Sequence, residues 1–411
     1  MTSTLSPPRV LSFEEARHIV EQHSANVHAG EVESVDLVAA RGRVLAQPLL
    51  ADRDFPPFPR AARDGYAVLA ADVAQVPTQL EVTGEIRAGE AQKLSVGKGQ
   101  AVSIMTGAPL PAGADAVVMV EYTRSSGKSV EIQRSVSSGE NFVLRGSEAR
   151  QGQMLVDRGV RLDHATIAIA ASVGRSRLQV YQKPHVAVLS TGDEVVEINA
   201  APGPAEIRNS NTYSLAAQIE SAGGQAIRLP IAPDEPKRLR ALIEEGLRYD
   251  LLLLTGGVSM GKYDLVEQVL AELKAEFYFT GAQIQPGKPI VFGSCHVPDQ
   301  KFFFGLPGNP VSTMVTFRLF AQPMIEALVG MQPLPLIFLK ARLKSEVRTK
   351  TGLKRFLPAV LSGEFENAEV ERSRWQGSGD IAGLARSNCF LVIPPDRERI
   401  GAGEYVSVLL P

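Results

Sequence analysis

LLLLTGGVSMGKYD, residues 251–264, combines three features that indicate an α/β fold. Four consecutive leucines bounded by glycines are typical of a parallel strand that is covered on both faces. Apolar residues then recur at helical spacing over residues 265–274. A strand, a glycine loop and a helix in this order form an anion site in open α/β sheets, because the helix-start N–H groups point at the ligand. The simpler alternative is a tight turn with Asp264 as a helix cap.

The same segment partly matches a P-loop. Residues 256–262 fit G-x-x-x-x-G-K, but Tyr263 follows where a hydroxyl residue should ligate magnesium. Lys262 also lies close to a candidate metal carboxylate, so we reject the P-loop. Asp264, at the mouth of the loop, is instead a candidate ligand for a metal ion that bridges phosphates.

Composition limits the class of protein. A chain of 411 residues predicts roughly two to four domains. The net charge of −2 and the lack of long charge runs argue against nucleic acid or a membrane surface as the main partner. Cys295 and Cys389 form no metal or disulfide framework. With no signal peptide and no apolar stretch of membrane-spanning length, we expect a soluble, reduced, cytoplasmic protein.

The pattern of apolar, polar, Gly and Pro residues changes along the chain. Ser12 and Glu15 form a capping-box pattern that predicts a helix to about His23. Short strands separated by Gly or Pro over residues 66–143 predict a compact β domain. The alanine-rich residues 163–173 predict a buried helix.

The second half of the chain shows two further residue patterns. Strands and helices alternate between about residues 183 and 329, which predicts a parallel three-layer α/β domain. After Gly330, short strands with polar turns predict a small closed sheet or barrel.

Three loops of the α/β region follow apolar strands, at residues 190–194, 255–264 and 306–310. The carboxyl ends of parallel strands share one edge, so these loops should converge with Asp234, which follows a neighbouring strand. Acidic groups beside phosphate-binding glycines repel the ligand unless a cation lies between them. Oxygen ligands without His or Cys favour magnesium. The polar side chains expected at this edge are Ser190, Thr191, Asp193, Glu194, Asp234, Ser259 and Asp264.

An ordered set of motifs resembles the molybdopterin molybdenumtransferases, the MoeA and gephyrin E-domain family. The α/β region contains LSTGDE (189–194), NSNTYSL (209–215), TGGVSMGKYD (255–264), QPGKP (285–289) and GLPGNPVS (305–312). The flanking regions contain RDGYAV (63–68), SIMTGAPLP (103–111) and WQGSGDIAGLARSN (375–388). The similarity covers nearly the whole chain.

The resemblance implies a multidomain α/β plus β protein with four parts. These are an elongated dimerisation domain (residues 8–48 and 145–180), an inserted β domain (49–144), a three-layer parallel α/β molybdopterin-binding domain (181–329) and a C-terminal β-barrel (330–411). It implies a homodimer that inserts molybdate into adenylylated molybdopterin, with magnesium-dependent release of AMP. Transient contacts with the pterin adenylyltransferase and with molybdoenzymes are also implied.

The resemblance also implies roles for individual residues. The catalytic residues would be Asp64, Glu194, Asp234 and Asp264, of which Asp234 and Asp264 would hold magnesium. The substrate-binding residues would be Thr106, Ser190, Thr191, Gly192, Asp193, Gly256, Gly257, Ser259, Lys288, Pro289, Gly308, Asn309 and Ser378. Among them, Lys288, Pro289 and Ser378 match positions near molybdate. Asp64 and Thr106 match positions that reach the cleft of the partner subunit.

Several residues depart from the family pattern. Gln285 stands where many members have a lysine, and Pro358 where an arginine often lines the molybdate site; the sequence leaves open whether Arg355 replaces it. Glu148 and Arg63 replace an aspartate and a methionine. One charge-assisted hydrogen bond supplies roughly 1.5–3 kcal/mol. We therefore expect a weakened molybdate site, which a Gln285→Lys substitution would strengthen.

Three alternatives remain beside this interpretation. A paralogue that binds pterin but uses tungstate, or has lost transfer, would fit the missing cations. A pterin- or nucleotide-processing enzyme related to the adenylyltransferases and CinA proteins would share the α/β domain, but not the RDGYAV and QGSGD motifs. A scaffold role like that of gephyrin would need a partner-binding linker, which the sequence does not contain.

Overall fold

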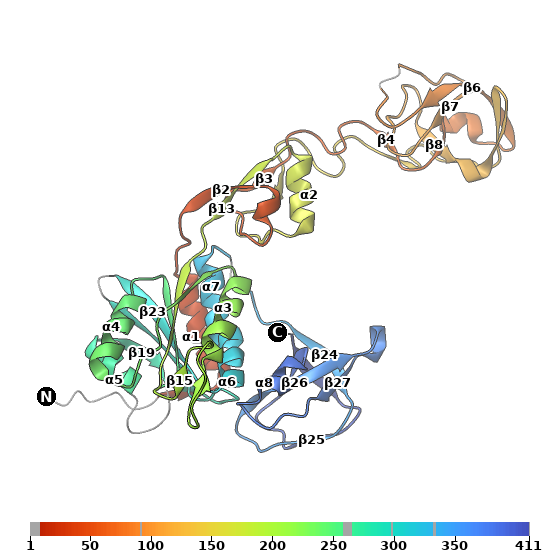
Figure 1. Ribbon diagram of the computed structural model, residues 1–411. Coiled ribbons are helices and arrows are strands. Elements are labelled where there is room, and N and C mark those ends of the chain that lie inside the picture. The colour runs from red at the N-terminus through yellow and green to blue at the C-terminus, as the bar shows by residue number, and fades with distance from the viewer. Residues whose placement is uncertain (1–8, 91–92, 258–264, 297–298, 332–333, 411) are drawn as a thin grey trace. The chain divides into compact units, whose positions relative to one another are not determined.

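The chain forms two compact units in the computed structural model (Figure 1). The structure describes residues 9–90, 93–257, 265–296, 299–331 and 334–410. The first unit comprises Met1–Ser34, Gly42–Ala46 and Gln179–Pro411, and the second comprises Val35–Arg41 and Gln47–Leu178. The predicted four-part division is finer than these two units and stays a prediction.

The leucine run forms an interior strand, β18, of a six-stranded sheet in the first unit. The strand order is β17 (Gln225–Arg228), β14 (His185–Ser190), β18 (Leu251–Thr255), β23 (Gln300–Leu306), β22 (Val291–His296) and β19 (Glu276–Phe279). β18 is parallel to both neighbours, and its register pairs Thr255 with Ser190 and with Leu306. The carboxyl ends of β14, β18 and β23 therefore meet at one edge, as predicted.

One strand departs from the predicted parallel arrangement. β17, β14, β18 and β23 are parallel, whereas β22 runs antiparallel to both β23 and β19. β22 and β23 are consecutive strands with only a few residues between them, and so short a connection joins antiparallel strands. The apolar character of these strands is evident in the sequence, but their direction is not.

Helices cover both faces of this sheet, which gives the predicted three layers (Figure 1). One face packs against α1 (Phe13–Ala25), α3 (Ser210–Ala222), α6 (Pro310–Thr316) and α7 (Gln322–Leu328). The other face packs against α4 (Pro236–Gly246) and α5 (Leu265–Glu272). Leu251 and Leu253 belong to the first core, and Leu252 and Leu254 to the second. Because successive side chains of a strand point to opposite faces, the leucine run supplies both cores.

Local hydrogen bonds and backbone conformation explain two of the helix ends. The Ser12 hydroxyl accepts a hydrogen bond from the Glu15 N–H at 3.2 Å, and the Glu15 carboxylate accepts one from the Ser12 N–H at 2.9 Å, which confirms the capping box of α1. α3 ends at Gly223, whose φ of 100° lies in the left-handed region that glycine adopts without strain. A π-helical segment, Phe317–Ala321, joins α6 to α7.

The second unit contains the predicted β domain. Its six-stranded sheet has the order β8 (Ala116–Met119), β5 (Gly65–Val68), β7 (Gln100–Ile104), β6 (Thr78–Ile86), β10 (Ser129–Ile132) and β9 (Thr123–Ser126). β6 and β7 are parallel, and the other pairs are antiparallel. Two cores, on either side of the sheet, bury its alternating apolar residues.

The alanine-rich helix α2 (His164–Ser172) forms with Asp163 as its N-cap, but the prediction that it is buried is wrong for the single chain. Only Ala170 of this helix is buried, whereas Ile167 and Ile169 are partly exposed. Nearby, β3 (Leu49–Leu50) and β12 (Met154–Val156) form only a two-stranded pair. Short ladders of this kind offer too little apolar surface to cover a helix.

The C-terminal strands close into a barrel, as predicted. The ring consists of β26 (Lys354–Ser362), β27 (Glu369–Arg372), β24 (Phe338–Leu343), β30 (Tyr405–Leu409) and β28 (Cys389–Ile393), and β28 returns to pair with β26. A short strand of the α/β domain, β21 (Ile284–Gln285), pairs in parallel with the start of β26. This pairing sets Gln285 opposite Arg355 and joins the barrel to the QPGKP loop.

The other elements are short. The strands are β1 (Val10–Leu11), β2 (Val32–Asp36), β4 (Arg60–Ala61), β11 (Phe142–Val143), β13 (Arg177–Tyr181), β15 (Val195–Val196), β16 (Ile207–Arg208), β20 (Gly281–Ala282), β25 (Val347–Arg348) and β29 (Arg399–Ile400). The helix α8 spans Ile381–Ala385, and the 3-10 turns are Val38–Ala40, Ala70–Val73, Val120–Tyr122 and Phe365–Asn367.

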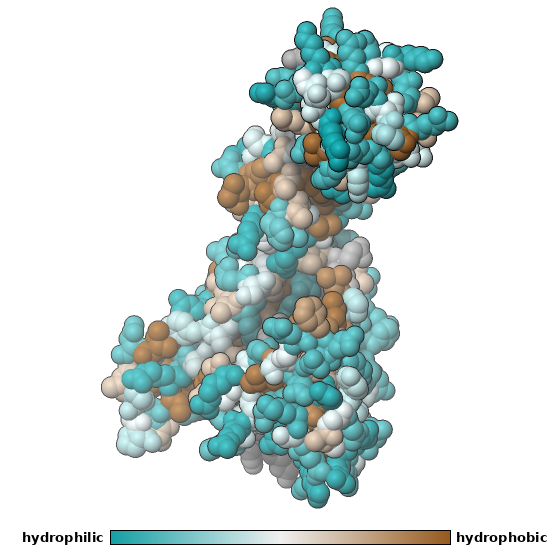
Figure 2. Space-filling model, turned by 90° about the vertical axis from the view of Figure 1, so that its right-hand side faces the viewer, coloured by the Kyte–Doolittle hydropathy of each residue, from teal (hydrophilic) through white to brown (hydrophobic). Residues whose placement is uncertain are grey.

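The described helices include none that is both long enough and apolar enough to cross a membrane. The face seen in Figure 2 is mostly hydrophilic, with separate small hydrophobic patches.

Candidate functional site

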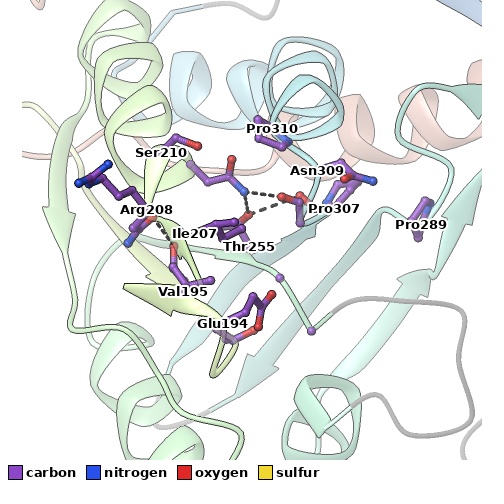
Figure 3. A pocket seen from close by; sticks show the side chains of 17 residues that line it. Glu194, Val195, Ile207, Arg208, Ser210, Thr255, Pro289, Pro307, Asn309 and Pro310 are labelled. Carbon is purple, nitrogen blue, oxygen red and sulfur yellow. Dashed lines mark hydrogen bonds between the residues drawn. The ribbon is translucent and has the colours of Figure 1, made fainter. Parts of the chain in front are cut away.

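A cavity of about 400 Å³ lies at the carboxyl ends of β14, β18 and β23 (Figure 3). Its lining residues are Ser190, Thr191, Glu194, Val195, Ile207, Arg208, Asn209, Ser210, Asn211, Thr255, Gly256, Gly257, Pro289, Pro307, Gly308, Asn309 and Pro310. The structure thus brings together eight residues that sequence reasoning assigned to the site: Ser190, Thr191, Glu194, Gly256, Gly257, Pro289, Gly308 and Asn309. Gly192, Asp193 and Asp234 are not part of this lining, and Ser259 and Asp264 lie outside the described residues.

Asn211, at the start of α3, ties three elements of the cavity together. Its side-chain N–H₂ group donates to the Thr255 hydroxyl at 2.9 Å and to the Gly308 carbonyl at 2.7 Å (Figure 3). The Thr255 hydroxyl in turn donates to the Pro307 carbonyl at 3.4 Å. Sequence reasoning missed this residue, although it lies in the NSNTYSL motif. These bonds fix the loop after β23 against the end of β18.

Two buried side-chain oxygens in this cavity have no partner among the described residues. They are Oδ1 of Asn211 and Oγ1 of Thr191. A buried polar group without a hydrogen bond is unfavourable by about 1–3 kcal/mol, so such groups are normally satisfied by a ligand or by water. The Asn211 oxygen can only accept a hydrogen bond, whereas the Thr191 hydroxyl can both donate and accept, so the two atoms suit a ligand with donor and acceptor groups.

Ser190, in contrast, is engaged within the protein. Its buried hydroxyl lies 2.7 Å from the Thr212 hydroxyl and donates to the Asn209 side-chain oxygen at 3.1 Å. The same oxygen accepts the Thr212 N–H at 3.1 Å and so caps α3. Ser190 therefore supports the helix start that forms one wall of the cavity.

The glycine loop passes close to the backbone of the first loop. Gly256 has φ +90°, and a Cβ atom there would lie 2.4 Å from the Thr191 carbonyl oxygen. At Gly257, with φ +62°, a Cβ atom would lie 2.8 Å from the Thr191 hydroxyl oxygen. A side chain at Gly256 would force the two loops apart, whereas one at Gly257 would have to displace the Thr191 and Val266 side chains.

A Gly256→Ala substitution is expected to destabilise the fold by about 1–3 kcal/mol, because it adds both backbone strain and a clash with rigid main chain. The free energy of unfolding in urea measures this effect. Gly127→Ala is a matched control, because Gly127 has φ +61° and a Cβ atom there would meet nothing within 4 Å. Equal destabilisation by both substitutions would mean that the close approach to Thr191 is unimportant.

Acidic residues gather beside the first loop. The Asp234 N–H donates to the Asp193 carboxylate at 3.1 Å. Asp234 is exposed, but desolvation by the surrounding protein, followed by the nearby negative charges of Asp193 and Glu194, raises the pKa of its carboxyl group. Among the described residues no group of three or more His, Cys, Asp or Glu side chains forms a ready-made metal site. The mutual repulsion of these carboxylates nevertheless suits a cation between them and an anionic ligand.

A second cavity, of about 810 Å³, lies between the QPGKP loop and the barrel. Its lining residues are Ile284, Gln285, Pro286, Gly287, Lys288, Pro289, Pro307, Asn309, Ser312, Lys350, Thr351, Leu353, Arg355, Arg372, Trp375, Gln376, Gly377 and Ser378. Four of these residues are cationic, and no carboxylate is among them. Pro289, Pro307 and Asn309 also line the first cavity, so the two cavities adjoin.

The three residues expected near molybdate, Lys288, Pro289 and Ser378, all line the second cavity. Pro358 does not line this cavity, whereas Arg355 does. The sequence left open whether Arg355 replaces the missing arginine, and the structure places its guanidinium group in the cavity wall. The Ser378 carbonyl accepts the Val311 N–H at 3.0 Å, which ties its loop to α6. Lys350 and Arg372 were missed, because isolated cations in a barrel carry no sequence signal.

Asp64 and Thr106 lie in the second unit, in contact with each other. The Thr106 N–H donates to the Asp64 carboxylate at 2.6 Å, and this bond lowers the pKa of Asp64. Glu148 forms an exposed ion pair with Arg60 at 2.7 Å. Exposed pairs of this kind contribute little to stability.

Comparisons with known families cover most of the chain. Residues 11–174 match the MoeA N-terminal region (domain I and II), residues 187–327 match a probable molybdopterin binding domain, and residues 340–410 match the MoeA C-terminal region (domain IV).

Curated relatives give the same result. A protein of Nostoc sp. named molybdopterin molybdenumtransferase is 36% identical over 391 residues, which are 92% of this chain and 88% of the relative. A protein of Bacillus subtilis with the same name is 33% identical over 390 residues, or 93% of this chain and 90% of the relative.

Solved structures agree as well. Two crystal structures of a molybdopterin biosynthesis MoeA protein from Pyrococcus horikoshii are similar over 98% of this chain. One has a TM-score of 0.79 at 29% identity and is covered over 100% of its length. The other has a TM-score of 0.71 at 33% identity and is covered over 99%.

Proposed function

The chain belongs to the MoeA family of molybdopterin molybdenumtransferases, and on this premise we propose that it inserts molybdate into adenylylated molybdopterin and releases AMP. One observation carries the proposal: a polar, glycine-lined cavity beside acidic loops adjoins a cavity with cationic and no acidic lining residues. Such a pair suits a pterin pyrophosphate next to an oxyanion. Matches on both sides of the α/β domain argue against an enzyme that shares only that domain.

The first cavity would bind the pterin pyrophosphate. Gly256 and Gly257 allow the ligand to approach bare backbone, the unpartnered oxygen of Asn211 would accept one of its N–H or O–H donors, and the unpartnered Thr191 hydroxyl would donate to it or accept from it. Asn309 and Pro289 lie at the junction with the second cavity and would contact the part of the ligand that receives the metal.

Magnesium would be held by Asp234 together with Asp264. The support is the environment of Asp234, where desolvation, followed by the nearby negative charges of Asp193 and Glu194, raises the pKa of the carboxyl group, so that a cation there would be favourable. When bound, the ion offsets negative charge on the pyrophosphate. Glu194, the carboxylate in the cavity wall itself, is suited to hold a water molecule or a proton beside the bond that releases AMP.

Molybdate would bind in the second cavity. Lys288 and Ser378 present an ammonium group and a hydroxyl group in its wall, and Pro289 shapes the passage to the pterin. Oxyanions are bound most strongly where cationic donors are not neutralised by carboxylates. The choice between molybdate and tungstate, contacts with the adenylyltransferase or molybdoenzymes, and a cytoplasmic location remain predictions from the sequence.

The proposed activity can be tested by cofactor reconstitution. The protein is incubated with adenylylated molybdopterin, magnesium and molybdate, and the mixture is added to a molybdoenzyme that lacks its cofactor. We expect the molybdoenzyme to become active. No activity, while chemically prepared cofactor restores the same enzyme, would contradict the proposal.

We also propose that the protein is a homodimer and that α2 lies in its interface, with Asp64 and Thr106 reaching the partner's cavity. The support is that α2 leaves Ala168 exposed and Ile167 and Ile169 partly exposed in the single chain. Sedimentation at micromolar concentration should give a dimer.

Ala168→Glu should shift this equilibrium towards monomer without lowering the melting temperature of the monomer. Ala402→Glu, at an exposed alanine of the barrel, is the control. A stable monomer of the parent protein, or an Ala168→Glu dimer as tight as the parent, would count against this arrangement.

A further inference from the structure

We propose that Arg355 is the guanidinium that binds the oxyanion in the second cavity, and that Gln285 positions it. The proposal deepens the proposed function, on which it rests only for the identity of the oxyanion as molybdate.

The geometry of Arg355 is fixed from two sides. β21 and β26 pair in parallel, with Gln285 opposite Arg355. The Arg355 Nε–H donates to the side-chain oxygen of Gln285 at 2.8 Å, and Nη1 donates to the Leu353 carbonyl at 3.0 Å. Nη2 donates to none of the residues that the structure describes. The two bonds hold the guanidinium plane, and the remaining N–H groups stay available for a ligand.

The charge of Arg355 is not balanced by the protein. The residue is only 6% exposed, yet it forms no ion pair with any residue that the structure describes. Arg17 is equally buried but forms an ion pair with Glu21 at 2.7 Å. Buried charges are normally paired, so an unpaired guanidinium in a cavity wall calls for an anion.

A second group in the same cavity wall points to the same chemistry. The indole N–H of Trp375 is buried and has no hydrogen-bond partner among the described residues. It is a donor only and cannot bind a cation. With Lys288, Lys350 and Arg372 also in the wall, the cavity suits a compact tetrahedral oxyanion that accepts several hydrogen bonds.

Gln285 is suited to its role because it is neutral. Its amide oxygen accepts from Arg355 without cancelling the positive charge, as a glutamate would. A lysine at 285 would remove this acceptor and place a second cation beside the buried guanidinium. The structure therefore reverses the expectation from the sequence: Gln285→Lys should weaken molybdate binding rather than strengthen it.

The test is calorimetric titration of the full-length protein with molybdate alone. Arg355→Gln should weaken molybdate binding by about tenfold to a hundredfold, the effect of one lost charge-assisted bond. Gln285→Lys should also weaken it, by about tenfold. The double variant Gln285→Lys/Arg355→Gln should bind better than either single variant, because one cation then faces a neutral amide. Titration with adenylylated molybdopterin should give unchanged affinity for all three variants.

Two further variants complete the test. Arg348→Gln removes a barrel arginine that is paired with Glu346 and does not line this cavity, and it should bind molybdate like the parent. Arg355→Lys keeps the charge but not the guanidinium geometry, so it should bind molybdate with an affinity between those of the parent and Arg355→Gln. If Arg355→Gln does not fold, weaker binding by Arg355→Lys than by the parent is the test.

The outcomes distinguish the assignment of Arg355, the positioning role of Gln285 and the proposed function. Unchanged molybdate affinity in Arg355→Gln, or parallel loss of molybdate and pterin binding, would overturn the assignment of Arg355. A double variant no better than the single ones would overturn the positioning role of Gln285. Normal molybdate binding without any AMP release would overturn the proposed function but leave the oxyanion site standing.

Discussion

Asp234→Asn is expected to reduce the rate of AMP release by at least about a hundredfold, because it removes a carboxylate from the magnesium site at the charge-developing pyrophosphate. The magnesium concentration needed for half-maximal rate should rise. Discontinuous measurement of AMP at several magnesium concentrations tests both effects. Glu235→Gln is a matched control, since Glu235 is the adjacent carboxylate and its side chain makes no capping bond.

The stability of the same variant separates catalysis from structure. Folding raises the pKa of Asp234. At pH values above the ordinary aspartate pKa, ionisation of Asp234 therefore destabilises the metal-free fold, and at lower pH values this effect is absent. Asp234→Asn should therefore unfold at the same or a higher temperature than the parent at neutral pH, without magnesium. In acid, where Asp234 is protonated, this difference should disappear.

Magnesium affinity of the parent should fall as the pH decreases through the raised pKa of Asp234, since the ligand must be deprotonated. A lower melting temperature of Asp234→Asn, together with normal AMP release, would mean that Asp234 only supports its loop.

Lys288→Ala is expected to weaken molybdate binding by about tenfold while the affinity for adenylylated molybdopterin stays within a factor of about two. The side chain can be removed cleanly, because the loop is held by main-chain bonds: the Lys288 carbonyl accepts the N–H groups of Ala282 and Ile290, each at 3.0 Å. Lys340→Ala removes a lysine of the barrel that bonds Ser407 and serves as control. Equal loss of both affinities would assign Lys288 to loop support.

Local signals in the sequence predicted much of the fold. The leucine run had to serve two cores, since a strand buried on both faces needs apolar side chains at every position. The capping box at Ser12 reports local hydrogen bonds, which few neighbouring residues determine. These features were confirmed for that reason.

Features that depend on distant contacts could not be predicted from the sequence in the same way. The direction of β22 depends on a hairpin rather than on its composition. The exposure of α2 depends on which surface packs against it. The sequence of an apolar helix is the same whether that surface belongs to its own chain or to a second copy. The bond between Gln285 and Arg355 joins residues far apart in sequence and exists only because β21 pairs with the barrel.

The candidate site shows the same division. The loops after β14, β18 and β23 converge as the parallel-edge rule predicts, and they bring Thr191, Glu194, Gly256 and Asn309 into one cavity. Asn211 was missed because it acts through two hydrogen bonds to neighbouring loops, which only the folded structure shows.

The central claim, that molybdate insertion releases AMP in adjoining cavities, is tested most directly by AMP release from the loaded protein. The protein is saturated with adenylylated molybdopterin and magnesium, freed of excess nucleotide, and AMP is measured before and after addition of molybdate, with tungstate in a parallel sample. Molybdate should trigger release of AMP equal to the bound nucleotide, and the Arg355→Gln variant should need more molybdate for the same rate. AMP release that is equally fast without any oxyanion, or no release when molybdate is bound, would contradict the account.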